Sequence, residues 1–405
     1  MYNPVKVIEV FLWGRRVGAL SHDYDQYSVF EYDPEFRKSG IEVAPFMMPL
    51  SRSIYHAEEF HLPRQMFSGL PGMIADSLPD AFGNALIKRY MESEQIDIRQ
   101  ITPLDRLAYV GSRGMGALVF KPAIKDEDVV PSAIDMRNLV DEARLAMNNR
   151  LSEMKGADAL REIIRVGTSA GGAQAKAVVG WNRETNEFLA GAGDLPEGFE
   201  HWLIKFSPLG MEEAGEKEYD IHRKAIAAGI KMSECCLCEL DGVKHFMTRR
   251  FDREGNRRHH LQTLCALQHV GHPSPREAKR YELLFRTAVD LNLGYEALEQ
   301  LFRRMAFNVY IEEVDDHTKN FSFLMKEGGE WELAPAYDLT GCHFSVEDKD
   351  FEAWSNPHVL SVNGKTGLIT DDDLLAVAER FGIGTAKRAL REIKDVLEVT
   401  KGDRL

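Results

Sequence analysis

The chain has 405 residues, 44% of them hydrophobic and 28% charged, which is the balance of a folded globular protein with two or three domains. Its formal net charge of −14 argues against autonomous nucleic-acid binding, because binding to backbone phosphates requires a basic surface. Polar residues interrupt every apolar run before the roughly 20 residues that a membrane span needs, and the N-terminus lacks a signal-peptide pattern. We therefore expect a cytoplasmic protein without a membrane partner.

The first part of the chain predicts a compact α+β domain over residues 1–122. Residues 5–13 alternate as in a strand, and because both faces are largely apolar we expect burial on both sides. A second strand is predicted at 27–32 and a helix at 82–91. The glycine-rich turn within 110–120 precedes another strand.

The remaining chain predicts a two-lobed α+β fold, with a β-rich half followed by a helical half. Residues 123–252 form the expected N-lobe with a helix-rich lead-in, and 253–405 the helical C-lobe, an order that is typical of kinases. The expected strands and helices are 177–181, 201–206, 218–228 and 244–252, with a mainly helical pattern from Leu261 and a short strand pair after Asn320.

Two clusters of one residue type invite a functional interpretation but favour an ordinary one. Cys235, Cys236 and Cys238 could bind a metal, yet no second Cys or His pair at zinc spacing accompanies them, so small core side chains are favoured. The odd total of five cysteines indicates reduced thiols. The basic cluster from Arg249 to Arg258 is interleaved with acidic residues, which predicts an exposed turn.

A loop of small residues, Gly171, Gly172, Ala173 and Gln174, could let backbone N–H groups approach a phosphate. It lacks the Walker A pattern, and a strand rather than a helix follows it. A kinase-type loop and a plain hairpin both fit this pattern.

A lysine and a glutamate downstream of this loop have the order found in kinases. Lys205 lies in the next strand, on the face opposite Ile204 and Phe206, where its ammonium could reach a nucleotide. Glu218 opens the following helix and could pair with it. An exposed strand lysine and a helix-start glutamate are the alternatives.

The strongest local signal is the pair Asp315 and Asn320, which has the D-x-x-x-x-N spacing of a kinase catalytic loop. That spacing alone recurs by chance about once in a chain of this length. Asp338 raises its weight, because it follows a strand-like pair where kinases place a second metal-binding aspartate. Oxygen ligands of this kind suit Mg²⁺.

Taken together, SAGGAQAK, WLIKF, RRFDR, DDHTKNFSFL and LAPAYDL resemble the HipA family, serine/threonine kinases that act as toxins in bacterial toxin-antitoxin pairs. The motifs LWGRRVGAL, FEYDPEF and VGSRGMGALVF resemble that family's N-terminal domain, so the resemblance covers nearly the whole chain. DxHxKNFS is the most specific of these motifs, and the glycine loop is less so.

The resemblance implies that Asp315 is the catalytic carboxylate, that Asn320 and Asp338 hold Mg²⁺ and that Lys205 contacts the phosphates of ATP. It also implies a self-phosphorylated serine at Ser169. Further implied ATP contacts are the loop residues Gly171, Gly172, Ala173 and Gln174, the backbone of Arg249 and Phe251 at adenine, and Asp252 at ribose.

Two positions depart from the family pattern: Ala175 replaces a proline or glutamate, and Glu312-Glu313 stands where many members have Gly-Asn. Beside the motifs, Asp316 is expected to face solvent and His317 to form a structural hydrogen bond. The three aspartates 371–373 after Thr370 are expected to start a helix.

The implied partners are a protein substrate, such as an aminoacyl-tRNA synthetase or another translation protein, and a DNA-binding helix-turn-helix antitoxin. A small-molecule phosphotransferase would share the nucleotide machinery and differ in the acceptor site. An inactive kinase-like co-repressor is the third reading, against which the intact Lys205, Asp315, Asn320 and Asp338 argue.

Overall fold

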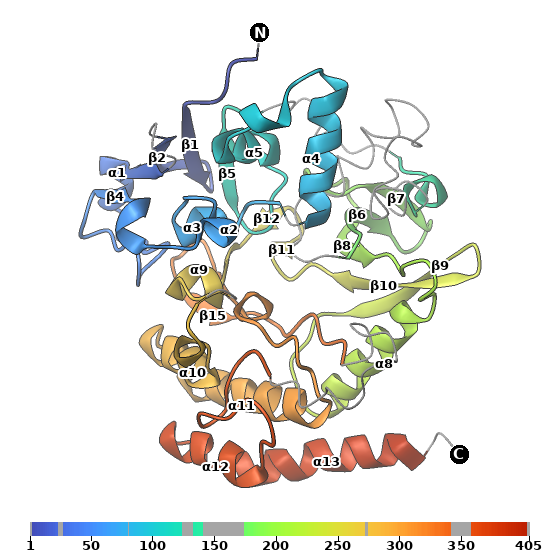
Figure 1. Cartoon of the computed structure of the whole chain (residues 1–405). Coiled ribbons are helices and arrows are strands. Elements are labelled where there is room, and N and C mark those ends of the chain that lie inside the picture. The colour runs from blue at the N-terminus through green and yellow to red at the C-terminus, as the bar shows by residue number, and fades with distance from the viewer. Residues whose placement is uncertain are drawn as a thin grey trace.

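A computed structural model contains both sheets and helices, as expected for the α+β class, with an N-terminal domain, a sheet-rich N-lobe and a helical C-lobe (Figure 1). Ser169, Gly171, Gly172 and Ala173 lie outside the described residues, as does most of the predicted helix-rich segment. The structure describes residues 2–22, 27–79, 81–123, 133–140, 174–271, 274–341 and 358–402.

The N-terminal domain is built on a five-stranded antiparallel sheet with the order β4-β3-β2-β1-β5. Its strands are β1 (Val7–Leu12), β2 (Arg15–His22), β3 (Ser28–Tyr32), β4 (Ile54–His56) and β5 (Leu118–Lys121). Its helices are α1 (Pro34–Arg37), α2 (Arg64–Phe67), α3 (Gly72–Ala75), α4 (Ala81–Ser93) and α5 (Pro103–Val110).

The first strand is buried on one face, not on both as its sequence suggested. Ile8, Val10 and Leu12 lie in the domain core, whereas Val7 is 50% exposed. The alternating pattern was therefore correct, but the apolar residues of the second face only partly meet other side chains.

The N-lobe is a second five-stranded antiparallel sheet, with the order β7-β6-β8-β10-β9. The long helix α8 packs against its β9 and β10 edge. The elements are β6 (Lys176–Asn182), β7 (Glu187–Ala190), β8 (Glu200–Lys205), α8 (Ala214–Ala227), β9 (Cys235–Leu240) and β10 (Val243–Arg249).

Helix α4 shares a hydrophobic core with this second sheet. Leu86 and Met91 of α4 belong to the same buried cluster as Trp202 and Ile204 of β8. Apolar burial of this kind is the main favourable term in holding two structural units together. The N-terminal domain and the N-lobe are consequently joined by a common core.

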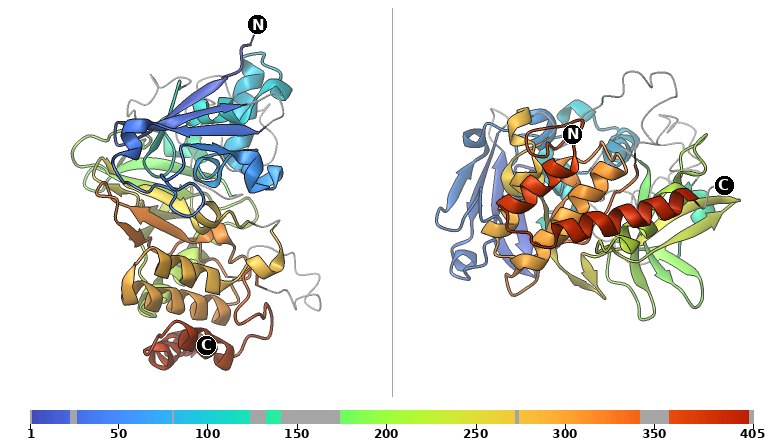
Figure 2. Two further views of the ribbon diagram at one scale, coloured as in Figure 1. Left: turned by 90° about the vertical axis from the view of Figure 1, so that its left-hand side faces the viewer. Right: turned by 90° about the horizontal axis from the view of Figure 1, so that it is seen from below.

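The C-lobe combines four longer helices with a small three-stranded sheet, β13-β14-β15. Helices α12 and α13 form an outer layer under α10 and α11, and α13 reaches α8 (Figure 2). The helices are α9 (Leu264–Gln268), α10 (Tyr281–Asp290), α11 (Gly294–Tyr310), α12 (Asp371–Arg380) and α13 (Ala386–Gly402), and the strands β13 (His260–Thr263), β14 (Ser322–Met325) and β15 (Trp331–Leu333).

Two expectations for this lobe have different outcomes. The aspartates after Thr370 do start a helix, because the Thr370 hydroxyl and the Asp373 carboxylate form a reciprocal cap at the start of α12. The helical pattern expected from Leu261 was wrong there, since residues 260–263 pair with β14 as a strand. Among the described helices none is long and apolar enough to cross a membrane.

The basic cluster predicted as an exposed turn is exposed at Arg249 and Arg257, but its other arginines form a largely buried contact with the N-terminal domain. Asp252 accepts the backbone N–H of Gly116 at 2.7 Å, and its carboxylate also binds Arg250 and Arg253. Arg253 and Arg258 donate back to the carbonyl of Gly116 at 3.0 and 3.1 Å. Gly116 has a φ of 74°, where a side chain would be strained.

Candidate active site

Three charged side chains, two of them buried and Asp338 partly exposed, meet where β8, α8 and the segment after β15 converge. The Nζ atom of Lys205 lies 2.5 Å from Oε1 of Glu218 and 2.5 Å from Oδ1 of Asp338. The side chains of Lys205 and Glu218 are only 7% and 5% exposed. One lysine therefore links the N-lobe sheet, the N-lobe helix and the C-lobe.

Lys205 and Asp338 stabilise each other's charge. Burial disfavours a charged lysine, but the adjacent carboxylates of Asp338 and Glu218 raise the pKa of Lys205 above its ordinary value. Burial likewise disfavours a charged aspartate, yet Lys205 and Lys176 hold the pKa of Asp338 well below its usual range. At neutral pH this gives an ammonium beside an ionised Asp338.

Lys176 is a second buried cation at this place, and sequence reasoning gave it no role. It lies directly opposite Lys205 in the β6–β8 ladder, and directly opposed residues project on the same face of a sheet. Its position at the end of the SAGGAQAK motif, immediately before the predicted strand, was the available signal.

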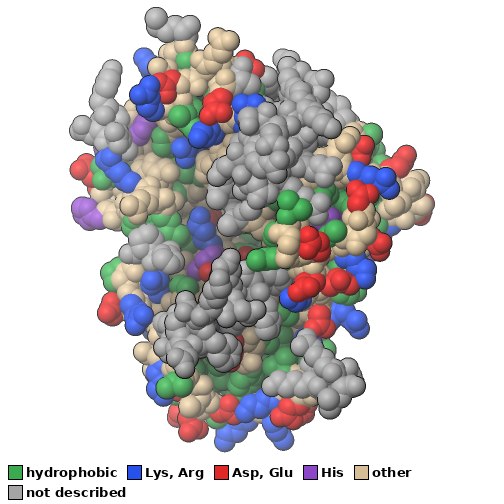
Figure 3. Space-filling view, turned by 45° about the vertical axis from the view of Figure 1, so that its right-hand side comes forward, with side chains coloured by type: hydrophobic (Ala, Val, Ile, Leu, Met, Phe, Trp, Pro, Cys, Tyr) green, Lys and Arg blue, Asp and Glu red, His purple; other side chains and the backbone are tan. Residues whose placement is uncertain are grey.

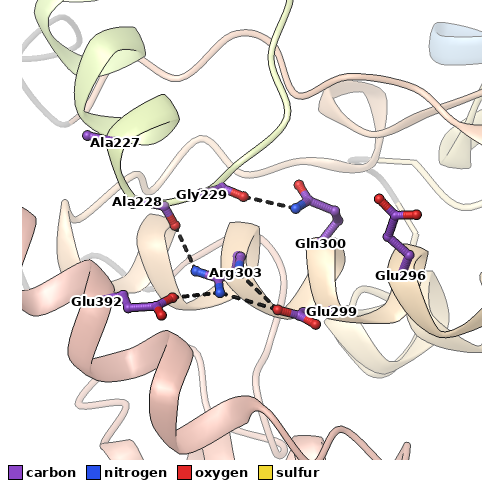
Figure 4. A pocket seen from close by; sticks show the side chains of 8 residues that line it. All are labelled: Ala227, Ala228, Gly229, Glu296, Glu299, Gln300, Arg303 and Glu392. Atoms are coloured by element: carbon purple, nitrogen blue, oxygen red, sulfur yellow. Dashed lines mark hydrogen bonds and ion pairs between the residues drawn. The ribbon is translucent and has the colours of Figure 1, made fainter.

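The helix that carries Glu218 begins earlier than expected, at Ala214, so Glu218 lies in its second turn and not at its start. The other end of α8 is held by the C-lobe helix α11 (Figure 4). Arg303 donates to the carbonyl of Ala228 at 2.9 Å, and Gln300 to that of Gly229 at 2.9 Å. These contacts satisfy backbone carbonyls left without partners at a helix C-terminus.

Arg303 lies at the bottom of a hollow of about 350 Å³ between α8, α11 and α13 (Figure 4). Its guanidinium also binds Glu299 of α11 at 3.2 Å and Glu392 of α13 at 2.6 Å. Since these partners already bind the guanidinium, we interpret the residues around the hollow as a structural network that holds α8 in place.

The predicted catalytic loop follows α11 and ends in a short 3₁₀ turn, Thr318–Asn320. The Asp315 side chain is 73% exposed. The side-chain amide of Asn320 donates to the Asp315 carbonyl at 3.0 Å, which leaves the amide oxygen of Asn320 available as a ligand. Asp315 and Asn320 are thus brought together as predicted.

The neighbouring His317 has a different arrangement from the one expected. Its Nε2 atom lies 4.0 Å from Oδ1 of Asp315, and its Nδ1 atom has no hydrogen-bond partner among the described residues. The expected structural hydrogen bond of its ring is therefore not found in the part of the chain that the structure describes.

Two buried carboxylates support this loop from behind. Asp316 was expected to face solvent but is 1% exposed, and it accepts hydrogen bonds from Tyr281, His358 and the Val359 amide. Glu313 accepts the amides of Asp315 and Gly341 at 3.2 and 2.7 Å.

Asn320 and Asp338 line the same small cavity, which also contacts Glu313 and Tyr337. Asp338 has a φ of 57°, a left-handed conformation that is strained for a residue with a side chain and is common at functional sites. A neutral amide oxygen and an ionised carboxylate are ligands of the type that Mg²⁺ accepts. The donor set therefore fits the predicted metal.

The predicted adenine-binding segment lies at the end of β10. Phe251 packs against Tyr337 with ring centroids 5.6 Å apart, next to Asp338. The side chain of Arg249 is exposed and pairs with Glu200 at 3.0 Å. This segment is thus close to the proposed metal ligands.

Two expected ATP contacts are engaged elsewhere. Asp252 is 0% exposed, and its carboxylate is bound by Arg250, Arg253 and the Gly116 amide inside the protein, while the ribose contact of Asp252 stays a prediction. The Gln174 side chain donates to the carbonyl of Phe206 at 3.1 Å, which anchors the end of the glycine loop to β8.

The predicted thiol cluster forms part of a strand. Cys235, Cys236 and Cys238 are free and partly buried in β9, and burial raises the pKa of each thiol. In the described ranges no group of three or more His, Cys, Asp or Glu side chains is placed to hold a metal.

Two family models match successive parts of the chain. Residues 168–402 match the model of the HipA-like C-terminal domain, and residues 8–121 match that of the HipA N-terminal domain. The chain belongs to the HipA family. The two segments meet at the contact between Asp252 and Gly116, so both parts of this HipA-family chain share one buried polar interface.

The fold is also that of a solved HipA assembly. The chain superposes with a TM-score of 0.65 and 18% identity on a chain of the "Shewanella oneidensis MR-1 Toxin Antitoxin System HipA, HipB and its operator DNA complex", covering 96% of this chain and 90% of that one. The Helicobacter pylori proinflammatory kinase CtkA gives a TM-score of 0.34 and 15% identity over 49% of this chain and 79% of that one.

Proposed function

We propose that this HipA-family chain is an ATP- and Mg²⁺-dependent serine/threonine protein kinase. The observation that carries the proposal is Lys205, whose ammonium lies 2.5 Å from both Glu218 and Asp338 while Asp338 shares a cavity with Asn320. A lysine paired with a helix glutamate, beside an aspartate and an asparagine for metal, is the set that phosphoryl transfer requires.

The residues of the proposed active site would have separate roles at the nucleotide and at the acceptor hydroxyl. Asn320 and Asp338 would hold Mg²⁺, which neutralises negative charge on the phosphates when it is bound. Lys205, with Lys176 opposite it, supplies positive charge toward the phosphates of the nucleotide. The exposed carboxylate of Asp315 orients the acceptor hydroxyl and accepts its proton.

The family and the solved assembly support a role as the toxin of a toxin-antitoxin pair. The Shewanella structure is described as a complex of HipA, HipB and operator DNA. We extend that partnership to this chain and propose a DNA-binding antitoxin as its partner. The net charge of −14 supports DNA association through such a partner and not through this chain alone.

The proposed acceptor is a protein hydroxyl, for which a translation protein such as an aminoacyl-tRNA synthetase is the first candidate. Ser169, two residues before Gly171, is proposed as a site of self-phosphorylation that switches the enzyme off. A phosphoserine adds about −1.5 to −2 charges and would compete with ATP phosphates for the same loop.

Labelled ATP decides between the candidate reactions. The purified chain is incubated with γ-labelled ATP and Mg²⁺ in a bacterial lysate, beside an Asp315→Asn control, and labelled products are separated. Label on a protein, absent in the control, is the expected result. Label on a metabolite would replace the proposal with a small-molecule phosphotransferase, and no transfer at all would favour a binding module.

Mass spectrometry of the same two preparations tests the serine. Phosphate on Ser169 in the active protein but not in Asp315→Asn is expected. An unmodified Ser169 in a preparation that labels its substrate would remove self-phosphorylation from the proposal.

A further inference from the structure

Helix α3 of the N-terminal domain contacts both ends of α9, a short helix of the C-lobe. At the start of α9, the Asp76 carboxylate accepts the Thr263 backbone N–H at 2.7 Å and the Thr263 hydroxyl at 2.8 Å. At its end, the Gly72 backbone N–H donates to Nε2 of His269 at 2.9 Å. These four residues form what we call the α3–α9 contact.

The contact is close-fitting. A Cβ atom on Gly72 would overlap the carbonyl oxygen of Ala266 and the ring of His269, so only glycine allows α3 to approach this closely. His269 has a φ of 54°, a left-handed conformation that presents its ring to Gly72. Burial lowers the pKa of His269 to about 4, so its ring is neutral and accepts the hydrogen bond at neutral pH.

The α9 helix and the segment directly after it in turn contact the proposed catalytic loop at two points. The Leu264 amide donates to the Phe321 carbonyl at 2.8 Å, and the Thr318 hydroxyl donates to the carbonyl of Val270 at 2.7 Å. Thr318 and Phe321 flank Asn320 on either side. A shift of α9 would therefore move the loop that carries Asp315 and Asn320.

A second route leads from Thr263 through the small sheet. Thr263 is opposite Ser322 in the β13–β14 ladder, and the Ser322 hydroxyl lies 2.5 Å from that of Tyr337. The Tyr337 hydroxyl donates to the Lys319 carbonyl at 2.6 Å, and Tyr337 directly precedes Asp338. Both routes from Asp76 end beside the proposed metal ligands.

From these contacts we infer that Asp76 is a positioning residue for phosphoryl transfer, through which the N-terminal domain holds the catalytic loop in place. The inference rests on the proposed kinase function and extends it to a residue of the other domain. Burial raises the pKa of Asp76 and Lys319 of the catalytic loop partly opposes this rise, which agrees with its place beside that loop.

The first test separates positioning from binding. In Asp76→Ala the rate of phosphate transfer at saturating ATP is expected to fall about tenfold to hundredfold, because small displacements of reacting groups have effects of this size. The KM for ATP should change less than twofold. Asp76→Asn keeps the shape and an acceptor oxygen, so it is expected to restore the rate to within about threefold of wild type.

Asp33→Ala is the matched control. Asp33 caps α1 in the same domain by accepting the amides of Glu35 and Phe36, so its loss removes a comparable cap far along the chain from the catalytic loop. Asp33→Ala should lower the melting temperature without changing the transfer rate. An equal loss of rate in Asp33→Ala, or an unchanged rate in Asp76→Ala, overturns the inference.

Amide hydrogen exchange gives a readout that does not depend on activity. The Asn320 amide, which donates to the His317 carbonyl, and the Leu264 amide should exchange faster in Asp76→Ala than in wild type and Asp33→Ala. If wild type transfers no phosphate, the proposed function fails. The role of Asp76 in holding the loop is then tested by hydrogen exchange alone. Unchanged exchange at both amides would show that Asp76 does not hold the loop.

Discussion

The nucleotide side and the acceptor side of the proposed active site are built in opposite ways. On the nucleotide side, the buried Lys205 pairs with the buried Glu218 and with the partly exposed Asp338. On the acceptor side, Asp315 is 73% exposed on a loop that is held from behind. The charges for the nucleotide are therefore set before a ligand arrives, whereas the acceptor carboxylate is open to a large partner such as a protein.

The largest effect is expected at Asp315, an exposed residue that should matter for catalysis but not for folding. Asp315→Asn should reduce phosphate transfer by about 10²- to 10⁴-fold while leaving the melting temperature and the affinity for ATP unchanged, because an exposed carboxylate contributes little to folding. Asp372→Asn, at another exposed aspartate, is the control and should behave as wild type. An active Asp315→Asn enzyme would exclude Asp315 as the catalytic residue.

The second effect concerns the nucleotide side. Lys205→Met leaves the buried Glu218 and the partly exposed Asp338 without their cation, so the free energy of unfolding should fall by about 3 kcal/mol in addition to the loss of ATP binding. Urea unfolding measures it. Adding Glu218→Gln should recover part of the stability, because it removes one of these two negative charges.

The control for this prediction is Lys244→Met, which removes an exposed ion pair with Glu216 and should not change stability measurably. If Lys205→Met and Lys244→Met had the same free energy of unfolding, the buried charges on the nucleotide side would not depend on Lys205 for stability.

A third, smaller effect tests whether the nucleotide side depends on the far end of α8. Arg303→Gln should lower the free energy of unfolding by about 1 to 3 kcal/mol, because the hydrogen bonds of the charged guanidinium to Ala228, Glu299 and Glu392 are lost. It should also weaken ATP binding by displacing Glu218.

Arg388→Gln is the matched control for Arg303, since Arg388 approaches the same two glutamates at 3.8 and 3.6 Å but is 57% exposed. Differential calorimetry with and without ATP should separate the two variants. If Arg388→Gln were as destabilised as Arg303→Gln, the exposed ion pairs and not the buried guanidinium would account for the stability of the network.

The smallest effect is a pH dependence behind the acceptor loop. Burial disfavours a charged ring, but Asp316 holds the pKa of His358 above its ordinary value of about 6.5. The stabilisation from the ion pair of His358 with Asp316 is thus complete below about pH 6.5 and is lost as the pH rises through the folded-state pKa of His358. Melting temperatures from pH 6 to 9 should decline in wild type and remain flatter in His358→Gln.

Other buried histidines do not obscure that test. Burial, with help from Arg250 and Arg253 at the first of them, lowers the pKa of His201 and of His260 to about 4. A lowered histidine pKa costs stability only as the pH falls below about 6.5. A decline above pH 7 that persisted in His358→Gln would point to another group.

Local patterns in the sequence predicted the candidate site residues but not the buried carboxylates that hold the surrounding segments in place. Lys205 was placed in a strand, and Asp315 and Asp338 after an apolar helix and a strand pair, and the structure has the three residues at these places in the fold. The burial of Asp316 and of Asp252 could not be predicted, because each depends on a contact with a distant residue, His358 at 42 positions and Gly116 at 136 positions along the chain. No local pattern shows that such a carboxylate is buried.

The same limit applies to strand pairing and to helix starts. β13 was taken as helical because its pairing with β14 joins residues about sixty positions apart. Glu218 was placed at a helix start from its charge alone, whereas α8 begins at Ala214. The role of Asp76 was equally invisible, since Thr263 is 187 residues away.

The buried contact of Asp252, Arg253 and Arg258 with Gly116 has a consequence for inheritance. A HipA-like C-terminal domain joined to the N-terminal domain of a distant relative would need the same backbone carbonyl and the same glycine, or its guanidinium groups would be buried without partners. Substitutions on the two sides of this contact should therefore be correlated between related chains. The two parts are expected to have been transmitted and to have diverged as a single unit.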